Sequence, residues 1–132
     1  KAIQRIFPQK EVNCYELMPI NQSFLIKTHN VNLLGDDFLQ NNSTGRYDRI
    51  IANPPFTKNQ DIDHINMMFK LLRPGGRIVS MASTHWRHSS NKKEKLFKEW
   101  LYDIDAAIID VPAGTFKDSG TTIETVIIVI DK

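Results

Sequence analysis

The stretch Tyr47-Asp48-Arg49-Ile50-Ile51-Ala52-Asn53-Pro54-Pro55-Phe56 decides how the rest of the chain is interpreted. Its first six residues have the pattern of a short apolar strand, which runs directly into Asn-Pro-Pro-Phe. Two consecutive prolines end the strand, because neither has an N–H and each restricts the residue before it. We expect this rigid turn to hold the Asn53 side chain and the Pro54 carbonyl at the lip of a sheet, where open α/β sheets bind their ligands.

Outward from this stretch, strand and helix patterns alternate along the chain. The spacing of apolar residues predicts the end of a helix over 1–7, a strand over 11–17, a helix over 21–28, strands over 31–34 and 47–52, a helix over 60–72, a strand over 77–82, a helix over 91–103, and strands over 106–111 and 123–130. In the helix over 91–103, Leu96, Phe97, Trp100 and Leu101 form the expected buried stripe.

This alternation predicts an α/β fold with a mostly parallel, doubly wound sheet covered on both faces. No helix pattern separates the last two strands, so we expect them to be adjacent and antiparallel, or to be separated by a longer excursion. The simplest arrangement has one reversed strand near the edge of the sheet. We expect residues 1–132 to form a single domain.

Composition narrows the functional class. The chain has 132 residues, 41% hydrophobic and 24% charged, with a formal net charge of +2, so any nucleic-acid footprint must be local. The single cysteine, Cys14, excludes a disulfide framework and fits a reducing compartment. Histidine and cysteine are not at zinc-ligand spacing, and no apolar run approaches the roughly 20 residues of a membrane span. These features predict a soluble, cytoplasmic protein with no metal and no membrane segment.

The chemistry of Asn53-Pro54-Pro55-Phe56 suits a planar amino group. An exocyclic aromatic amine is a poor nucleophile because its lone pair is conjugated with the ring. The Asn53 amide oxygen and the Pro54 carbonyl can accept its two N–H bonds and so favour a more nucleophilic geometry. Phe56 offers an apolar face on which a base could stack. The alternative interpretation is a strand-ending turn with a buried phenylalanine.

With these residues in place, nearly the whole chain resembles class I S-adenosylmethionine-dependent methyltransferases, specifically the amino-methylating group related to DNA adenine-N6 methyltransferases. The resemblance implies a Rossmann-like fold and S-adenosylmethionine as cofactor. It implies that Asn53, Pro54, Pro55 and Phe56 are catalytic, and that Asn53 also contacts the cofactor. Residues 72–77 (Leu-Arg-Pro-Gly-Gly-Arg) resemble the turn that enters the family's fifth strand.

The same resemblance implies further binding residues. Glu16, in Cys14-Tyr15-Glu16, matches the acidic residue that binds the cofactor ribose hydroxyls. Asp37-Phe38 matches the pair that contacts the cofactor adenine, with Asp36 as a competitor one residue away. The segment 114–121 (Gly-Thr-Phe-Lys-Asp-Ser-Gly-Thr) resembles the loop near the target base, and Phe116 within it is either a base stacker or a loop anchor.

A basic and aromatic stretch follows the strand over 77–82. It consists of His85-Trp86-Arg87-His88, with Lys92 and Lys93 close behind. Because it lies after the carboxyl end of a strand, on the expected ligand side, it could meet nucleic-acid phosphates, and Trp86 and Arg87 are candidate substrate contacts. The alternative is an ordinary solvated charged face.

One family motif has no counterpart in this sequence. The family's first strand ends in a glycine-rich turn that cradles the methionine end of the cofactor, yet residues 1–10 contain no glycine, and residues 1–7 have the pattern of the helix that follows such a turn. In the family, that strand lies at the centre of the sheet, between those matching 11–16 and 47–52. We therefore expect an N-terminally incomplete chain that by itself binds S-adenosylmethionine weakly or not at all.

The expected function is methyl transfer from S-adenosylmethionine to an exocyclic amino group, with adenine N6 in DNA as the acceptor and DNA as the partner, as in restriction–modification enzymes and those of phage and mobile elements. Relatives that share Asn-Pro-Pro-aromatic methylate guanine N2 in ribosomal RNA or a glutamine amide in release factors. An inactive nucleic-acid-binding remnant of the fold is the rival from another class. The sequence predicts neither the DNA target sequence nor the oligomeric state.

Overall fold

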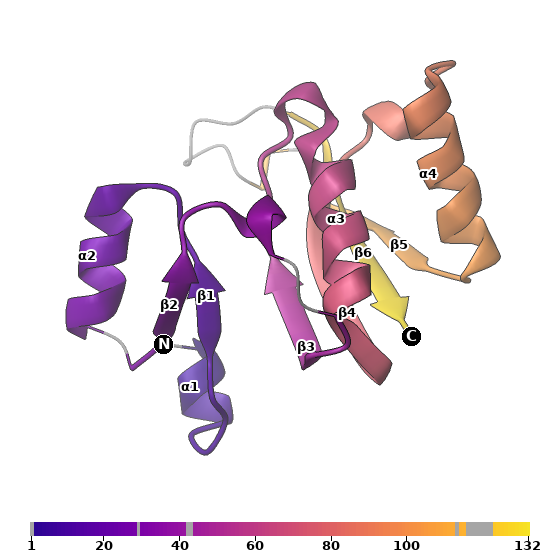
Figure 1. The fold of residues 1–132 in the computed structure, drawn as a ribbon. Helices are drawn as coiled ribbons and strands as arrows, with labels where there is room; N and C mark the ends of the chain where they lie inside the picture. The colour runs from indigo at the N-terminus through magenta and orange to yellow at the C-terminus, as the bar shows by residue number, and fades with distance from the viewer. Residues whose placement is uncertain (1, 29, 42–43, 113, 116–122) are drawn as a thin grey trace. The chain divides into compact units, whose positions relative to one another are not determined.

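The structure is a computed structural model that describes residues 2–28, 30–41, 44–112, 114–115 and 123–132 (Figure 1). The chain forms two compact units, Lys1–Asn41 and Asn42–Lys132. Each unit has its own sheet. The expectation of one domain over 1–132 stays a prediction.

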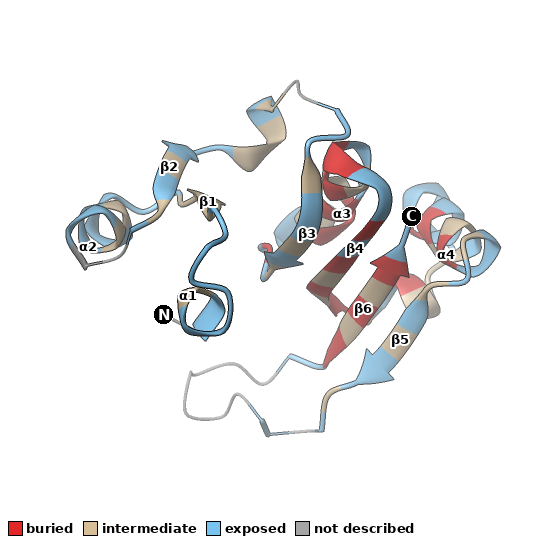
Figure 2. Ribbon diagram, turned by 90° about the horizontal axis from the view of Figure 1, so that it is seen from below, coloured by how far each residue is buried: buried red, intermediate tan, exposed pale blue. Residues whose placement is uncertain are grey.

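The first unit contains a two-stranded parallel sheet. Its elements are α1 (Ala2–Ile6), β1 (Asn13–Tyr15), α2 (Pro19–Thr28), β2 (Asn32–Gly35) and the short 3-10 helix η1 (Phe38–Gln40). Asn13 pairs with Asn32 and Cys14 with Leu33, as the predicted strand–helix–strand pattern requires. No described residue of this unit is fully buried (Figure 2). Packing therefore holds this unit less firmly than the second one.

The second unit contains a four-stranded mixed sheet. Its elements are β3 (Tyr47–Ala52), η2 (Thr57–Asn59), α3 (Gln60–Leu71), β4 (Leu72–Ser83), η3 (His85–Arg87), α4 (Lys92–Asp103), β5 (Ala107–Asp110) and β6 (Thr125–Asp131). The strand order is β3-β4-β6-β5. β3 and β4 are parallel, whereas β6 is antiparallel to both of its neighbours. The predicted reversed strand near the edge is confirmed, and so is the antiparallel pairing of the last two strands.

The core of the second unit lies between this sheet and the helices α3 and α4, which cover the same face (Figures 1 and 2). Alternate residues of β4 and β6 point into it, so that Ile78 lies opposite Ile130 and Ala82 opposite Val126, all of them fully buried. The helices contribute the side chains Ile62, Ile65, Met68, Leu71, Phe97 and Leu101. The other face of the sheet is partly open, and Ile51 is 66% exposed.

The predicted stripe of α4 needs one correction. Phe97 and Leu101 are buried, and Trp100 is half-buried with its ring edge-on to Phe69 at 5.2 Å. Leu96, however, is 53% exposed. Three positions of the helix fill the available core surface, and Leu96 falls at the border of that arc, where its side chain turns to solvent.

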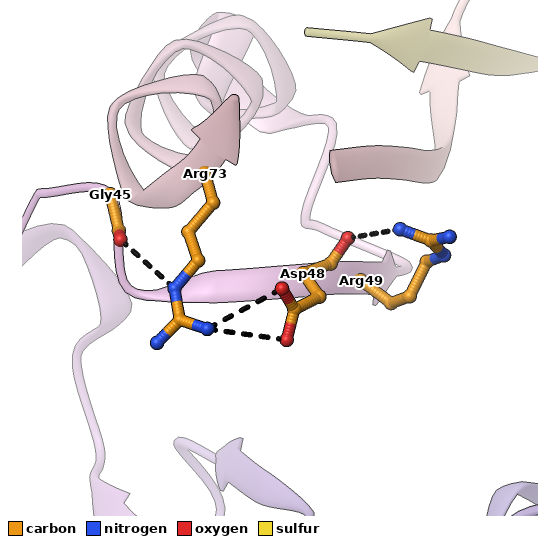
Figure 3. Close-up of polar contacts among 4 residues, drawn as sticks. All are labelled: Gly45, Asp48, Arg49 and Arg73. Atoms are coloured by element: carbon orange, nitrogen blue, oxygen red, sulfur yellow. Dashed lines mark hydrogen bonds and ion pairs between the residues drawn. The ribbon is translucent and has the colours of Figure 1, made fainter. Parts of the chain in front are cut away.

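β4 begins five residues earlier than the sequence predicts, because Pro74-Gly75-Gly76 is accommodated inside it at an irregularity of the pairing with β3. Gly75 has φ +79°, and a Cβ on Gly76 would lie 2.7 Å from Leu72 Cδ1, so both positions favour glycine. Arg73 fixes the amino ends of the two strands, since its guanidinium donates to the Gly45 carbonyl and to the Asp48 carboxylate (Figure 3). The carboxyl ends of β3 and β4 lie at the opposite edge of the sheet, and the candidate site is at that edge.

Candidate functional site

Asn53-Pro54-Pro55-Phe56 directly follows β3, at the edge where the parallel strand β4 also ends. Pro54 is buried, Phe56 is half-buried, and Asn53 and Pro55 are exposed. The Asn53 amide makes no hydrogen bond to any residue that the structure describes. The turn thus presents one planar amide, with its acceptor oxygen available, on a backbone held by two prolines.

The chain leaves this turn through a strained backbone. Lys58 (φ 54°, ψ 35°) and Asn59 (φ 58°, ψ 29°) are two consecutive non-glycine residues in the left-handed region. The cost is about 1–2 kcal/mol for a residue such as lysine, and less for asparagine. Strain of this kind is concentrated at functional sites, where the surrounding structure must hold it in place. Nothing in the sequence indicates these left-handed backbone angles, because neither position is glycine.

Asp61 anchors the far end of the same loop. Its carboxylate is completely buried, and Oδ2 accepts a hydrogen bond from the backbone N–H of Ser83, the last residue of β4, at 2.9 Å. Asp61 lies in the first turn of the helix predicted over 60–72, where an aspartate is usually an exposed charge that favours the helix N-terminus, so it is not singled out in the sequence analysis. Its spacing to Ile65 and Met68 (i, i+4, i+7) was the available signal, since it places the carboxylate on the buried stripe.

In the first unit, the predicted acidic residues meet at one edge. The Glu16 N–H donates to the Gly35 carbonyl at 3.3 Å, so Glu16 lies beside the end of β2, and its Oε1 accepts from the Met18 N–H at 2.8 Å. Asp36 directly follows Gly35, and its Oδ1 accepts from the Asp37 N–H. The parallel pairing of β1 and β2 therefore places both residues at the carboxyl edge of this sheet.

Asp37 and Phe38 form the turn after β2. Asp37 caps η1, with Oδ1 accepting from the Leu39 N–H at 3.0 Å and Oδ2 from Gln40 Nε2 at 3.2 Å. Both oxygens of Asp37 thus serve its own turn. Phe38 is half-buried and lies edge-on to Tyr15 at 5.3 Å, which fixes the orientation of its ring.

The pKa of the Cys14 thiol depends on the charge of Glu16. Burial raises the pKa of the Cys14 thiol above its ordinary value of 9.0, and the negative charge of Glu16 raises it further. The thiol therefore stays protonated near neutral pH and serves as a small packing residue. Its pKa provides a probe of the Glu16 carboxylate.

The basic stretch after β4 differs from the prediction. Trp86 is 2% exposed and lies edge-on to Phe97 at 5.5 Å, so the expected contact of Trp86 with a substrate does not fit its place in the core. Arg87 pairs with Asp110 at 2.7 Å, and Lys93 pairs with Asp63 at 2.7 Å. Arg87 still reaches the surface, and its substrate role stays a prediction.

Three other basic groups of the stretch, His85, His88 and Lys92, are exposed. Phe116 lies outside the described residues. Across the described ranges, no group of three histidine, cysteine or acidic side chains could hold a metal ion. No helix in those ranges is long and apolar enough to cross a membrane.

The order of strands and helices, the parallel pairs and the reversed strand β6 define a Rossmann-like methyltransferase fold. The model of the methyltransferase small domain family matches residues 10–116, and the chain belongs to that family. A search of the curated proteins finds no match.

Solved structures share the fold. A Listeria monocytogenes protein classed among S-adenosylmethionine-dependent methyltransferases of class I has a TM-score of 0.74 at 13% identity, and the match covers 98% of this chain and 48% of that one. The methyltransferase subunit of a type I restriction-modification system from Streptococcus thermophilus has a TM-score of 0.75 at 18% identity, covering 99% and 36%. The N-methyltransferase NodS from Bradyrhizobium japonicum, in complex with S-adenosyl-L-homocysteine, has a TM-score of 0.55 at 18% identity, covering 96% and 69%. The chain spans less than half the length of the first two.

Proposed function

We propose that this chain is the core of a methyltransferase that transfers a methyl group from S-adenosylmethionine to an exocyclic amino group, with adenine N6 in DNA as the acceptor. The observation that carries the proposal is the exposed Asn53 amide, which bonds to none of the described residues, on the Pro54-Pro55 turn at the carboxyl end of β3. Membership in the methyltransferase small domain family supports methyl transfer. The fold shared with a restriction-modification subunit is consistent with a DNA acceptor.

The residues of the turn act by positioning. Asn53 Oδ1 and the Pro54 carbonyl accept the two N–H bonds of the amine and turn its lone pair away from ring conjugation. Phe56, half-buried and so limited in its movement, stacks on the base. No base is needed before attack, because the amine is neutral and loses its proton only after the new bond forms. Holding the amine in line is expected to supply most of the rate enhancement.

The edge of the first unit fits the cofactor chemically. When bound, S-adenosylmethionine supplies an electrophilic methyl group. A carboxylate has about four acceptor positions, and the Met18 N–H takes one on Glu16, so the remainder can hold the two hydroxyls of a ribose. Phe38 offers a fixed ring for the adenine, and Asp36 or Asp37 offers a carboxylate beside it. The weak cofactor binding expected of this chain is tested by calorimetric titration, and micromolar affinity would contradict it.

The function is tested by incubating the protein with unmethylated duplex DNA and labelled S-adenosylmethionine, at a cofactor concentration high enough to offset the weak binding expected above, then digesting the DNA to nucleosides. We expect label in N6-methyladenine, and a loss of at least about 100-fold in Asn53→Ala, as for other groups that stabilise a transition state. Asn66→Ala, at an exposed asparagine of α3, is the matched control and should keep full activity.

Parallel reactions with ribosomal RNA and with a release factor separate the alternative acceptors. Label in either substrate but not in DNA would replace adenine as the acceptor. DNA binding without label in any of the three would favour the inactive remnant of the fold. Full activity of Asn53→Ala on DNA would contradict the assigned mechanism.

A further inference from the structure

Two buried polar atoms have no hydrogen-bond partner among the residues that the structure describes, and they are complementary. One is Oδ1 of Asp61, an acceptor, and the other is Nε1 of Trp86, a donor. Asp61 is 0% exposed and Trp86 2% exposed. Buried polar groups are almost always paired, because leaving one without a partner carries its whole desolvation penalty.

Both atoms belong to residues held next to the end of β4. The other oxygen of Asp61 accepts the Ser83 N–H at 2.9 Å. Trp86 follows Ser83 by three residues, in the turn η3, which is closed by the bond from the Arg87 N–H to the Thr84 carbonyl at 3.0 Å. Ser83 therefore lies between the two in the chain and is bonded directly to one of them.

We propose that one buried water joins the two atoms, accepting from Trp86 Nε1–H and donating to Asp61 Oδ1. A single carboxylate then joins three segments: the first turn of α3, the last residue of β4 and the turn η3. A buried water with two or three polar partners is an ordinary way to satisfy such a pair. The indole is fixed on its other side by Phe97, so it can hold this orientation.

The contacts that join Asp61 to β4 and η3 give this residue a role in positioning, and that role rests on the proposed function. Asp61 follows Asn53 by eight residues, and the strained pair Lys58-Asn59 lies between them. A strained loop keeps its shape only when its ends are fixed. β3 fixes the Asn53 end, and Asp61 fixes the other end to β4 and η3. Asp61 touches no reacting atom, and it acts through the shape of the Asn53–Phe56 turn.

The test uses the indole N–H signals in the ¹H–¹⁵N spectrum of the chain. There are only two tryptophans, so Trp86→Phe and Trp100→Phe assign both signals. Asp61→Asn is the informative variant. An asparagine has one acceptor oxygen and so cannot accept from both the Ser83 N–H and the bridging water that holds the indole N–H. We expect the Trp86 signal to move upfield and its hydrogen exchange to become faster, with the Trp100 signal unchanged.

Asp63→Asn is the matched control, because it removes the same charge from the same helix turn at a side chain that is 43% exposed and paired with Lys93. It should leave the Trp86 signal in place. The double variant Asp61→Asn/Trp86→Phe also removes the indole N–H that Asp61→Asn leaves unpaired. Its urea midpoint should therefore be higher than the midpoint expected from adding the losses of the two single variants.

A Trp86 signal that Asp61→Asn does not move, or strictly additive losses in the double variant, would overturn the proposed bridge. If Asp61→Asn does not fold alone, a double variant that folds supports the proposed bridge, and a double variant that does not fold contradicts it. These measurements need neither cofactor nor acceptor, so their failure is distinct from failure of the proposed function. In an active protein, Asp61→Asn should lower kcat with little change in KM, whereas Asp63→Asn should change neither.

Discussion

Arg77 and Asp131 face each other across the antiparallel pair β4–β6 and form a two-point contact, with Nε donating to Oδ1 at 2.6 Å and Nη2 donating to Oδ2 at 2.8 Å. Both side chains are largely exposed. Arg77 is the first residue of β4 that pairs with β6, and Asp131 is the last residue of β6, so the contact lies at the end of this ladder away from the edge that carries Asn53. It therefore bears on the stability of the sheet and not on the site.

The first prediction concerns acid stability. The hydrogen bonds from Arg77 hold the pKa of Asp131 below its ordinary value of 3.8. Because the pKa is lower in the folded state, this contribution is present above the unfolded pKa and is lost as pH falls through the folded pKa. Asp131→Asn should lower the urea midpoint at pH 7 and make almost no difference near pH 2. Asp48→Asn, whose contact with Arg73 is longer at 3.4 Å, is the control and should show a smaller dependence.

The second prediction compares two leucines on α4. Leu101→Ala should destabilise the chain by about 2–5 kcal/mol, because the side chain is 1% exposed and its removal leaves a cavity. Leu96→Ala should change the free energy of unfolding by no more than about 0.5 kcal/mol, since that side chain is 53% exposed. Urea unfolding of both variants decides the matter, and equal losses would show that the helix packs in a different rotation.

The third prediction concerns the left-handed residues. Lys58→Gly should raise the free energy of unfolding by up to about 1 kcal/mol, because it removes strain of about 1–2 kcal/mol and adds the chain entropy of glycine. It should also lower methyl transfer by loosening the turn after Phe56. Asp105→Gly, at φ 55° between α4 and β5, should give a similar gain in stability with full activity. A Lys58→Gly variant that is both stabilised and fully active would remove the functional reason for the strain.

The fourth prediction uses Cys14. Burial and Glu16 both raise the pKa of its thiol, so Glu16→Gln should lower that pKa part of the way. At pH 8, iodoacetamide should then alkylate Cys14 faster, by a factor of several, because more of it is thiolate. Glu11→Gln serves as the comparison, since Glu11 is exposed and does not contribute to the pKa shift of Cys14. Unchanged alkylation in Glu16→Gln would mean that the carboxylate does not face the thiol.

The fifth prediction separates the basic residues near η3. Lys92 has no acidic partner within the described ranges, whereas Arg87 is paired with Asp110 at 2.7 Å. If the stretch meets DNA phosphates, Lys92→Ala should weaken duplex binding and reduce the slope of log K against log[salt] by about 1. Asp110→Asn frees Arg87 and should strengthen binding. Identical salt slopes in all three proteins would place the phosphate contacts elsewhere.

Much of the second unit could be predicted from local patterns. The bounds of β3 match the prediction residue for residue, since Asn53-Pro54-Pro55 can only end a strand, and α3 and α4 follow their apolar spacing to within one residue. The order of the strands in the sheet was harder to predict from the sequence. The insertion of β6 between β4 and β5 depends on pairings such as Arg77 with Asp131, and no local pattern encodes a partner 54 residues away.

The part of the site that depends on backbone chemistry, the Asn53–Phe56 turn, could be predicted from the sequence. The parts that depend on side-chain packing were predicted less well. Trp86 belongs to a polar, basic stretch, yet the turn η3 directs its ring onto Phe97, which a linear pattern cannot show. Asp61 was overlooked for the opposite reason, because a first-turn aspartate is usually a solvated helix charge. Both errors concern side chains whose surroundings come from β4, α3 and α4 together.

The placement of β6 also has a kinetic consequence. β4 and β5 do not pair with each other, so the sheet of the second unit is not continuous until Thr125–Asp131 has entered between them. During synthesis, α3, β4 and α4 leave the ribosome before the strand that completes their core. Their apolar surfaces stay exposed until β6 has been made. Long-range pairings of this kind form slowly, and the exposed surfaces are prone to aggregation in the meantime. Val126, Ile128 and Ile130 therefore determine when this unit folds as well as how stably.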